Sequence, residues 1–451
     1  MRIHFISIGG SVMHQLAIAL KQKGYTVTGS DDEIFEPAVS NLKKEGILPA
    51  ENGWFPEKIT PDIEAVILGM HAKEDNPELA KAKELGLKIY SFPEYIFQQS
   101  LHKKRVAIAG SHGKTTTTAM LMQVLKSAGF DFDYLVGASL PGFSKSVQIT
   151  DAPIIVCEAD EYPASTIERR PKFHFLYPHI AVITGIAWDH INVFPTFDIY
   201  LEQFIIFINK IEKSGVLIYN ETDEVLKELI NNNLRKDIRY LPYHLPEHKI
   251  VNGKTSVIID NIKTELKIFG NHNLLNLQAA FLVSKELGMK ESDFAKGIAS
   301  FEGASKRLEI ILQSNEGNIY RDFAHAPSKV KASVNAVKQQ FPEKTLIAIL
   351  ELHTFSSLNK AFMEQYKGAM ENADEAIVFY SRHALDLKRM NFLEPEMVKK
   401  GFQKQNLEVI TDRKELENKL KTINFLNTNL LFMSSGNYDG LNILSAINVK
   451  N

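Results

Sequence analysis

Residues 110–117 read Gly-Ser-His-Gly-Lys-Thr-Thr-Thr and directly follow the apolar run Val106–Ala109. A strand that ends in a glycine-rich turn points backbone N–H groups at phosphates, and the next helix adds the positive end of its dipole. Lys114 is placed to reach the outer phosphates and Thr115 to hold Mg²⁺. The general pattern has a glycine where this chain has Ile108, and the chain places Gly110 instead. The segment therefore predicts a shortened phosphate loop and the use of a nucleoside triphosphate.

Acidic and histidine side chains follow two later apolar runs. Glu158-Ala159-Asp160-Glu161 ends the run that begins at Pro153, and Trp188-Asp189-His190 follows the run 180–185. Carboxylates at a strand end near a phosphate loop are where Mg²⁺ is usually held. Taken alone, an acidic cluster is more often a solvated loop, and a single histidine is more often polar surface. Both segments are therefore candidates for the site because the chain also contains the phosphate loop with Lys114.

Another candidate site lies at the N-terminus, where Ile8-Gly9-Gly10-Ser11 follows an apolar strand and Asp31 closes the next one. This arrangement is similar to a dinucleotide fingerprint, but Ser7, Gly9 and Val12 fill its three glycine positions. A bulky Val12 would crowd a pyrophosphate pressed on the helix. The segment predicts a nucleotide-like ligand. An NAD-dependent oxidoreductase, which this loop alone would also suggest, leaves the phosphate loop unexplained.

Charged residues also open the last third of the chain, at Arg307 and at Arg321-Asp322-Phe323-Ala324-His325. An arginine near a domain junction can swing onto triphosphate oxygens, and an aspartate can bind a ribose hydroxyl. Without a wider pattern, a surface arginine and an aspartate at a strand end are the simpler interpretation.

The composition limits the classes of protein that fit. The chain has 451 residues, enough for roughly three domains. Lys and Arg number 52 against 54 Asp and Glu, which gives no electrostatic case for nucleic acid or an anionic membrane as partner. The single cysteine, Cys157, excludes a disulfide framework within the chain. Because no apolar run reaches ~18 residues and no signal peptide opens the chain, we expect a cytoplasmic protein without transmembrane helices.

Strands and helices alternate along the whole chain. In residues 1–100 we expect helices near 12–23, 36–45 and 77–85 between the strands Arg2–Ile8, Tyr25–Thr28, Ala65–Leu68 and Lys88–Tyr90. The polar stretch 100–105 is interpreted as a linker. This βαβ pattern implies parallel sheets, which bind ligands at the carboxyl ends of their strands.

The later segments repeat the pattern. A second unit begins at Val106, with strands at Ile154–Glu158 and 180–185, a helix near 198–211, two short strands within 249–268 around Asn252-Gly253, and a helix near 273–287. A third unit has strand candidates at Ile319–Phe323, Leu346–Leu350, Ala376–Phe379, Leu407–Ile410 and Asn429–Met433. The fold class is therefore α/β in three domains, with expected boundaries 1–102, 103–305 and 306–451.

Taken together, the motifs resemble those of the Mur ligase family of ATP-dependent, amide-forming enzymes of peptidoglycan synthesis. The resemblance covers essentially the whole chain and rests on six motifs in the family's order: Gly110–Thr116, Glu158–Glu161, Asp189-His190, the run Gly270-Asn271-His272-Asn273 to Ala280, Arg307-Leu308-Glu309, and Asp322–His325. It implies a Rossmann-like N-terminal domain that binds a UDP-sugar, a central P-loop ATPase-like domain, and a Rossmann-like C-terminal domain that completes the ATP and amino-substrate sites.

The resemblance also implies the reaction. ATP would convert the carboxylate of UDP-N-acetylmuramate to an acyl phosphate, which an incoming amine attacks. Glu158–Tyr162 and the basic segment Arg169–Phe173 are similar to the branch that adds the recycled tripeptide L-alanyl-γ-D-glutamyl-meso-diaminopimelate. Ligation of L-alanine in de novo synthesis is the alternative. A binding or regulatory protein without ligase activity is a further alternative, disfavoured by the intact motif residues. We expect a monomer or a weak homodimer.

Residue roles follow from the same resemblance. The catalytic residues implied are Lys114, Glu158, His190 and Arg307. ATP would be bound by Gly110, Ser111, His112, Gly113, Lys114, Thr115, Thr116, Asn271, Asn276, Arg307 and Asp322. The UDP-sugar would be bound by Gly9, Gly10, Ser11, Ser30, Asp31 and His71, and the amino substrate by Tyr162, Arg169, Arg170, His325 and His353. Mg²⁺ would be held by Thr115, Glu158 and His190. His325-Ala326-Pro327 stands where the family has His-His-Pro, and no lysine occurs around Phe204–Phe207, where several members carry a carbamylated one.

Overall fold

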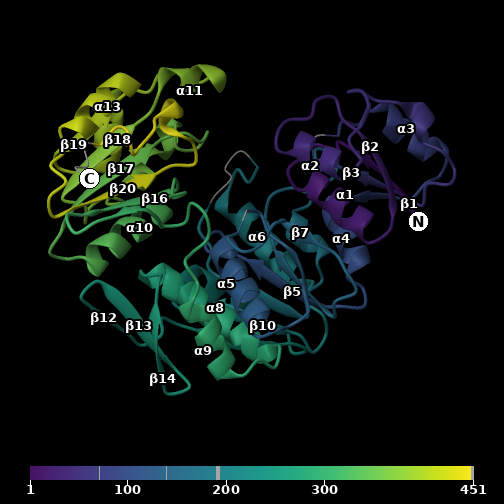
Figure 1. The fold of residues 1–451 in the computed structure, drawn as a ribbon, viewed down its shortest axis with the longest axis horizontal. Coiled ribbons are helices and arrows are strands. Elements are labelled where there is room, and N and C mark those ends of the chain that lie inside the picture. Colours follow the sequence, from purple (N-terminus) through teal and green to yellow (C-terminus); the bar gives the residue numbers. More distant parts are fainter. Residues whose placement is uncertain (71, 139, 189–192, 448–451) are drawn as a thin grey trace. The chain divides into compact units, whose positions relative to one another are not determined.

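The computed structural model describes residues 1–70, 72–138, 140–188 and 193–447 (Figure 1). The elements gather into two compact units. The first comprises Met1–Trp188, Pro195–His244 and Gln278–Gly297, and the second comprises residues 193–194, 245–277 and the described residues from 298 onward. No helix in these described ranges is both long and apolar enough to cross a bilayer.

The N-terminal part of the first unit is a parallel four-stranded sheet in the order β2-β1-β3-β4. Its strands are β1 (Arg2–Ile6), β2 (Thr26–Ser30), β3 (Ala65–Leu68) and β4 (Ile89–Ser91), and its helices are α1 (Met13–Gln22), α2 (Ala38–Lys44), α3 (Pro77–Glu84) and α4 (Phe92–Gln99). β1 ends at Ile6 rather than at Ile8, because Ser7 turns the chain with a φ of 67°. The predicted α/β architecture is confirmed here.

A seven-stranded sheet forms the rest of the first unit, in the order β11-β10-β9-β5-β8-β6-β7. The strands are β5 (Lys104–Ala109), β6 (Asp133–Leu135), β7 (Val147–Gln148), β8 (Ile154–Glu158), β9 (Ile180–Ile183), β10 (Val216–Asn220) and β11 (Arg239–Tyr243). The helices of this segment are α5 (Lys114–Ser127), α6 (Phe197–Asn209) and α7 (Glu224–Asn232). Two further helices, α8 (Asn271–Glu286) and α9 (Glu291–Ala299), have most of their residues in the first unit, but α8 begins and α9 ends with residues of the second. Because β5 pairs in parallel with β8, the phosphate loop lies beside the acidic segment.

The polar stretch 100–105, interpreted from the sequence as a linker, is partly buried. β5 already begins at Lys104, and the side chains on either side of it are buried. Lys103 Nζ lies 2.8 Å from Asp133 Oδ2, and Arg105 Nη2 lies 2.6 Å from Glu212 Oε1. These carboxylates, distant in the sequence, neutralise the buried cations, so composition alone does not reveal that Lys103 and Arg105 are buried.

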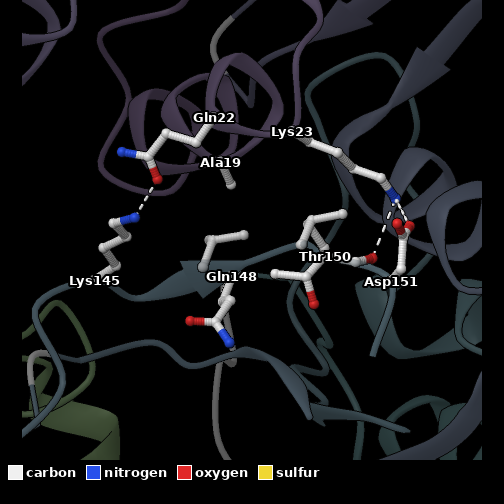
Figure 2. Close-up of a pocket in the computed structure, with 9 residues that line it drawn as sticks. Ala19, Gln22, Lys23, Lys145, Gln148, Thr150 and Asp151 are labelled. Atoms are coloured by element: carbon white, nitrogen blue, oxygen red, sulfur yellow. Dashed lines mark hydrogen bonds and ion pairs between the residues drawn. The ribbon is translucent and has the colours of Figure 1, made fainter. Parts of the chain in front are cut away.

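A groove of about 300 Å³ lies where α1 meets the segment Lys145–Asp151. Figure 2 shows Lys23 directed at Asp151 and Thr150, and Gln22 facing Lys145. Lys23 Nζ is 3.3 Å from Asp151 Oδ1 and 3.1 Å from the carbonyl oxygen of Thr150. These contacts join the four-stranded part of the first unit to the seven-stranded part.

The second unit contains two sheets. A small antiparallel one consists of β12 (His248–Val251), β13 (Lys254–Ile259) and β14 (Ile262–Leu266), so the two strands predicted around Asn252-Gly253 are three. The large one has the order β15-β16-β20-β17-β18-β19. Its strands are β15 (Glu309–Gln313), β16 (Asn318–Asp322), β17 (Thr345–Glu351), β18 (Glu375–Phe379), β19 (Leu407–Ile410) and β20 (Thr428–Met433).

Both faces of the large sheet are covered. Along β17, Leu346, Ala348 and Leu350 enter one hydrophobic cluster, whereas Ile347 and Ile349 enter another. This alternation is expected of a strand between two helical layers. The helices of this part are α10 (Pro327–Gln340), α11 (Arg382–Leu387), α12 (Pro395–Phe402) and α13 (Arg413–Lys421).

Candidate active site

The phosphate loop connects β5 to α5 through two glycines with positive φ, Gly110 at 123° and Gly113 at 82°. The loop is packed closely against the end of β9. A Cβ atom on Gly110 would lie 2.2 Å from Thr184 Oγ1 and 2.9 Å from the Thr184 nitrogen. Thr184 Oγ1 also donates a hydrogen bond to the carbonyl oxygen of His112. Lys114 is the first residue of α5, so the ammonium and the helix N-terminus act on the same region.

The ammonium group of Lys114 is held by two oxygens. Its Nζ lies 2.5 Å from Glu161 Oε2 and donates to the carbonyl oxygen of Gly110 over 2.8 Å. Burial lowers the pKa of Lys114, but the neighbouring carboxylates, Glu161 foremost, outweigh it, so the net pKa is raised. The side chain therefore carries a full positive charge at neutral pH, as required of a group that neutralises phosphates.

Thr115 and Glu158 form the oxygen-bearing part of the site. Thr115 Oγ1 donates to Glu158 Oε1 over 2.8 Å, and the Gly137 amide donates to Glu158 Oε2 over 2.8 Å. A hydroxyl and a carboxylate are the oxygen ligands that suit Mg²⁺, which takes one or two protein carboxylates and completes its shell with water and phosphate. The described residues contain no group of three His, Cys, Asp or Glu side chains that could hold a metal ion. The donor set at Thr115 and Glu158 fits Mg²⁺.

Tyr200 is a site neighbour that the sequence does not indicate. Its hydroxyl lies 2.8 Å from Ser111 Oγ and donates to Glu161 Oε1 over 3.3 Å. Ser111 Oγ also accepts from the Ala187 amide over 2.9 Å. Tyr200 lies on α6 and is fully buried, so in the sequence it resembles the other core aromatics of that helix.

The basic segment predicted for the amino substrate folds back onto the acidic one. Lys172 Nζ lies 2.7 Å from Asp160 Oδ2 and 5.8 Å from the centre of the Tyr162 ring. Arg170 is exposed and bonded to Glu168, with its Nη2 2.6 Å from Glu168 Oε2. Arg169 is exposed as well. Tyr162 and Lys172 are thus brought together, whereas the Arg170 charge already has a carboxylate partner.

The N-terminal turn places Asp31 against the glycines after β1. The Gly9 amide donates to Asp31 Oδ2 over 2.7 Å, and a Cβ atom on Gly9 would lie 2.9 Å from the same oxygen. Burial, the largest effect, raises the pKa of Asp31 to about 6. Ser30 is buried and Ser11 is exposed. His71, predicted for the same ligand, and Asp189 and His190, predicted for the metal, lie outside the described residues.

The remaining predicted residues belong to the second unit. Asp322, at the end of β16, accepts a hydrogen bond from Ser333, and the Arg307 guanidinium lies 4.6 Å from the centre of the neighbouring Phe323 ring. His325 Nδ1 is 2.8 Å from the carbonyl oxygen of Phe323. Asn271 and Asn276 lie on the first turns of α8.

His353 follows β17, at the same carboxyl edge of the large sheet as Asp322. Its Nδ1 is 3.8 Å from Glu351 Oε1. Burial lowers the pKa of His353 more than Glu351 raises it, so the ring is neutral at pH 7. The carboxyl edge of this sheet therefore gathers a carboxylate, an arginine and two histidines that the sequence singles out.

Comparison with known proteins identifies the family. Three family descriptions match in succession: "Mur ligase family, catalytic domain" at residues 2–104, "Mur ligase middle domain" at 108–284, and "Mur ligase, glutamate ligase domain" at 306–436. The UDP-N-acetylmuramate–L-alanine ligase of Caldicellulosiruptor bescii is 33% identical over 395 residues, covering 83% of this chain and 82% of the relative. The enzyme of that name from Clostridium kluyveri is 32% identical over 391 residues, covering 84% and 82%.

Solved structures share the fold. A murein peptide ligase Mpl from Psychrobacter arcticus has a TM-score of 0.65 at 22% identity, with all of both chains covered. The UDP-N-acetylmuramate-alanine ligase MurC from Thermotoga maritima has a TM-score of 0.68 at 22% identity, covering 99% of this chain and 97% of that one.

A phosphate loop in an α/β chain, with a lysine and carboxylates at adjacent strand ends, defines a class of enzymes that use a nucleoside triphosphate. The chain belongs to the Mur ligase family, and it is an ATP-dependent amide ligase. The resemblance inferred from the six motifs is confirmed.

Proposed function

We propose that this protein uses ATP to join the carboxylate of UDP-N-acetylmuramate to the amino group of L-alanine. The observation that carries the proposal is the cluster at the N-terminus of α5, where the Lys114 ammonium and the Thr115–Glu158 pair lie at adjoining strand ends. The choice of L-alanine is supported by the curated relatives of about 30% identity, which carry the name of that ligase. L-alanine thus has more support than the tripeptide, which the sequence motifs favour.

The chemistry proceeds by displacement at phosphorus and then at carbon. A carboxylate oxygen attacks the γ-phosphorus and ADP leaves, which converts a poor electrophile into an acyl phosphate. The amine nitrogen then attacks the carbonyl carbon, loses a proton, and inorganic phosphate leaves. Lys114 neutralises the β/γ-phosphates and the backbone amides of the loop orient them. Thr115, Glu158 and His190 would hold Mg²⁺, which neutralises phosphate charge when bound.

One structural observation favours the tripeptide as a second candidate. Lys172 pairs with Asp160 and lies above Tyr162, and the exposed Arg169 belongs to the same segment, so basic side chains gather next to the acidic strand end. A tripeptide brings several carboxylates into the amine site, and cations suit them. L-alanine brings one carboxylate and needs fewer cationic side chains around it.

A single assay decides between the amines. Purified protein is incubated with ATP, Mg²⁺ and UDP-N-acetylmuramate, with L-alanine in one reaction and the tripeptide in another, and ADP release is measured. We expect release with L-alanine. Release with the tripeptide alone would establish the second candidate, and equal background in both reactions would refute the ligase proposal.

Replacement of Lys114 tests the role of the cluster at the N-terminus of α5. Lys114→Ala removes the ammonium that faces the phosphates, so the rate of ADP formation is expected to fall at least about a hundredfold. Lys126→Ala is the matched control, because Lys126 lies at the other end of α5, where it contacts the carbonyl oxygen of Gly142 and the Phe143 ring. Near-normal ADP formation by Lys114→Ala, with normal circular dichroism, would refute the assignment.

A further inference from the structure

The loop 163–171 begins next to the phosphate site and closes on itself there. The Lys172 amide donates to the Tyr162 carbonyl oxygen over 3.0 Å, and the Ala164 amide donates to the Arg170 carbonyl oxygen over 2.9 Å. Lys172 also pairs with Asp160, one residue before the Glu161 that binds Lys114. The base of the loop is therefore connected by hydrogen bonds and an ion pair to the carboxylates around the phosphate loop.

The tip of the loop is a tight turn that lies against the N-terminal sheet. Ser165 Oγ accepts from the Glu168 amide over 2.8 Å, which fixes the turn. The Thr166 amide donates to the carbonyl oxygen of Met70 over 3.1 Å, and Thr166 Oγ1 donates to that of Ala72 over 2.6 Å. Ile167 packs against the hydrophobic cluster formed by β3, α3 and their neighbours.

The segment that Thr166 holds follows β3, at the carboxyl edge where a parallel sheet binds ligands. It also contacts the turn after β1. Gly69 donates to the carbonyl oxygen of Ile6 over 2.8 Å, and a Cβ atom on Gly69 would lie 2.7 Å from Ser7 Cβ. Thr166 is thus linked to the glycine turn that carries Gly9 and Gly10 through two contacts, its own with Met70 and that of Gly69 with the start of the turn.

We propose that the loop 163–171 keeps the sugar-nucleotide site in register with the phosphoryl-transfer site, and that Thr166 is its positioning residue. Thr166 acts on the backbone around residues 70 and 72, while the base of the loop is tied to Asp160 and Glu161. The inference rests on the proposed function, because it takes UDP-N-acetylmuramate as the ligand of the N-terminal turn. Since Thr166 is itself exposed, its replacement is not expected to unfold the protein.

The test compares variants of the full chain. Thr166→Val keeps the shape of the side chain but removes the hydroxyl, Thr166→Ser keeps the hydroxyl, and Thr422→Val is the control. Thr422 Oγ1 donates to the carbonyl oxygen of Lys419 over 2.7 Å, a similar bond in the second unit. Binding of UDP-N-acetylmuramate is measured by calorimetry, and KM for ATP and kcat by ADP release.

We expect Thr166→Val to weaken UDP-N-acetylmuramate binding about three- to tenfold, the effect of one lost hydrogen bond, with KM for ATP unchanged. Thr166→Ser and Thr422→Val are expected to bind as the unaltered chain does. Unaltered UDP-N-acetylmuramate binding by Thr166→Val, or a rise in KM for ATP as large as the loss of UDP-N-acetylmuramate affinity, would overturn the positioning role alone. Failure of the unaltered chain to bind UDP-N-acetylmuramate would overturn the proposed function and this proposal with it.

Discussion

Asp31 illustrates, at the scale of a single residue, how burial tunes a carboxylate in this protein. Its side chain is almost completely buried just after β2 and accepts a hydrogen bond from the Gly9 amide. Burial raises its pKa to about 6, whereas the backbone hydrogen bonds lower it. The folded protein therefore binds a proton at Asp31 more tightly than the unfolded chain does.

The stability contributed by this proton is complete below the unfolded-state pKa and is lost as pH rises through about 6. Compared with Asp31→Asn, the unaltered protein is expected to lose free energy of unfolding between pH 4 and pH 7, by about 1–3 kcal/mol. Urea denaturation of both proteins across this range measures the difference. A difference that does not change with pH would contradict the raised pKa.

The sequence places Lys114 and Glu158 after two apolar runs, and the parallel pairing of β5 with β8 brings the ends of these runs side by side. That both residues act on phosphates stays a prediction. Tyr200 could not be predicted, since only the folded position of α6 directs its hydroxyl at Ser111 and Glu161. The pairing of Arg170 with Glu168 could not be predicted either, because it depends on the tight turn of the loop that contains both residues.

At the scale of elements, the phosphate loop depends on a glycine where no side chain has room. Gly110→Ala forces a Cβ atom onto Thr184 as well as an unfavourable φ, so we expect at least about tenfold weaker ATP binding. Gly129→Ala is a matched control, because Gly129 has a φ of 74° and nothing lies within 4 Å of its Cβ position. Calorimetric titration with ATP measures both variants, and equal affinities would contradict the role of the close contact.

The elements that could be predicted are those with strong local patterns. Buried apolar runs such as Ala65–Leu68 and Leu407–Ile410 become strands with the predicted bounds. β7 has two residues and β11 contains Pro242, so neither has a recognisable strand pattern. β15 is an edge strand without a fully buried residue, and it was missed for the same reason.

At the scale of the whole molecule, the chain consists of two compact units with separate hydrophobic clusters. The α/β class was predictable, because strand and helix patterns alternate along the sequence of each unit. The burial of Lys103 and Arg105 was not, because Asp133 and Glu212 pair with them from distant positions in the sequence.

A buried ion pair offers a test of the division into units. Lys103→Met leaves the buried Asp133 carboxylate without its cation, which is expected to destabilise the first unit by about 3–5 kcal/mol. Lys338→Met breaks a more exposed pair with Asp374 in the second unit, and its effect is expected to be about 1 kcal/mol or less. We expect two calorimetric unfolding transitions, of which Lys103→Met lowers only one. A shift of every transition together would contradict separate units.

Cys157 has a practical consequence for measuring motion between these units. It is the single cysteine of the chain, 3% exposed on β8, and burial followed by the nearby Asp133 raises its pKa to about 12. The thiol is therefore unreactive toward maleimides at neutral pH. Cysteines introduced at exposed positions such as Lys44 and Lys414 can be labelled with a fluorophore pair without removing the native one. Energy transfer between the dyes would then report the separation of the two units as each substrate binds.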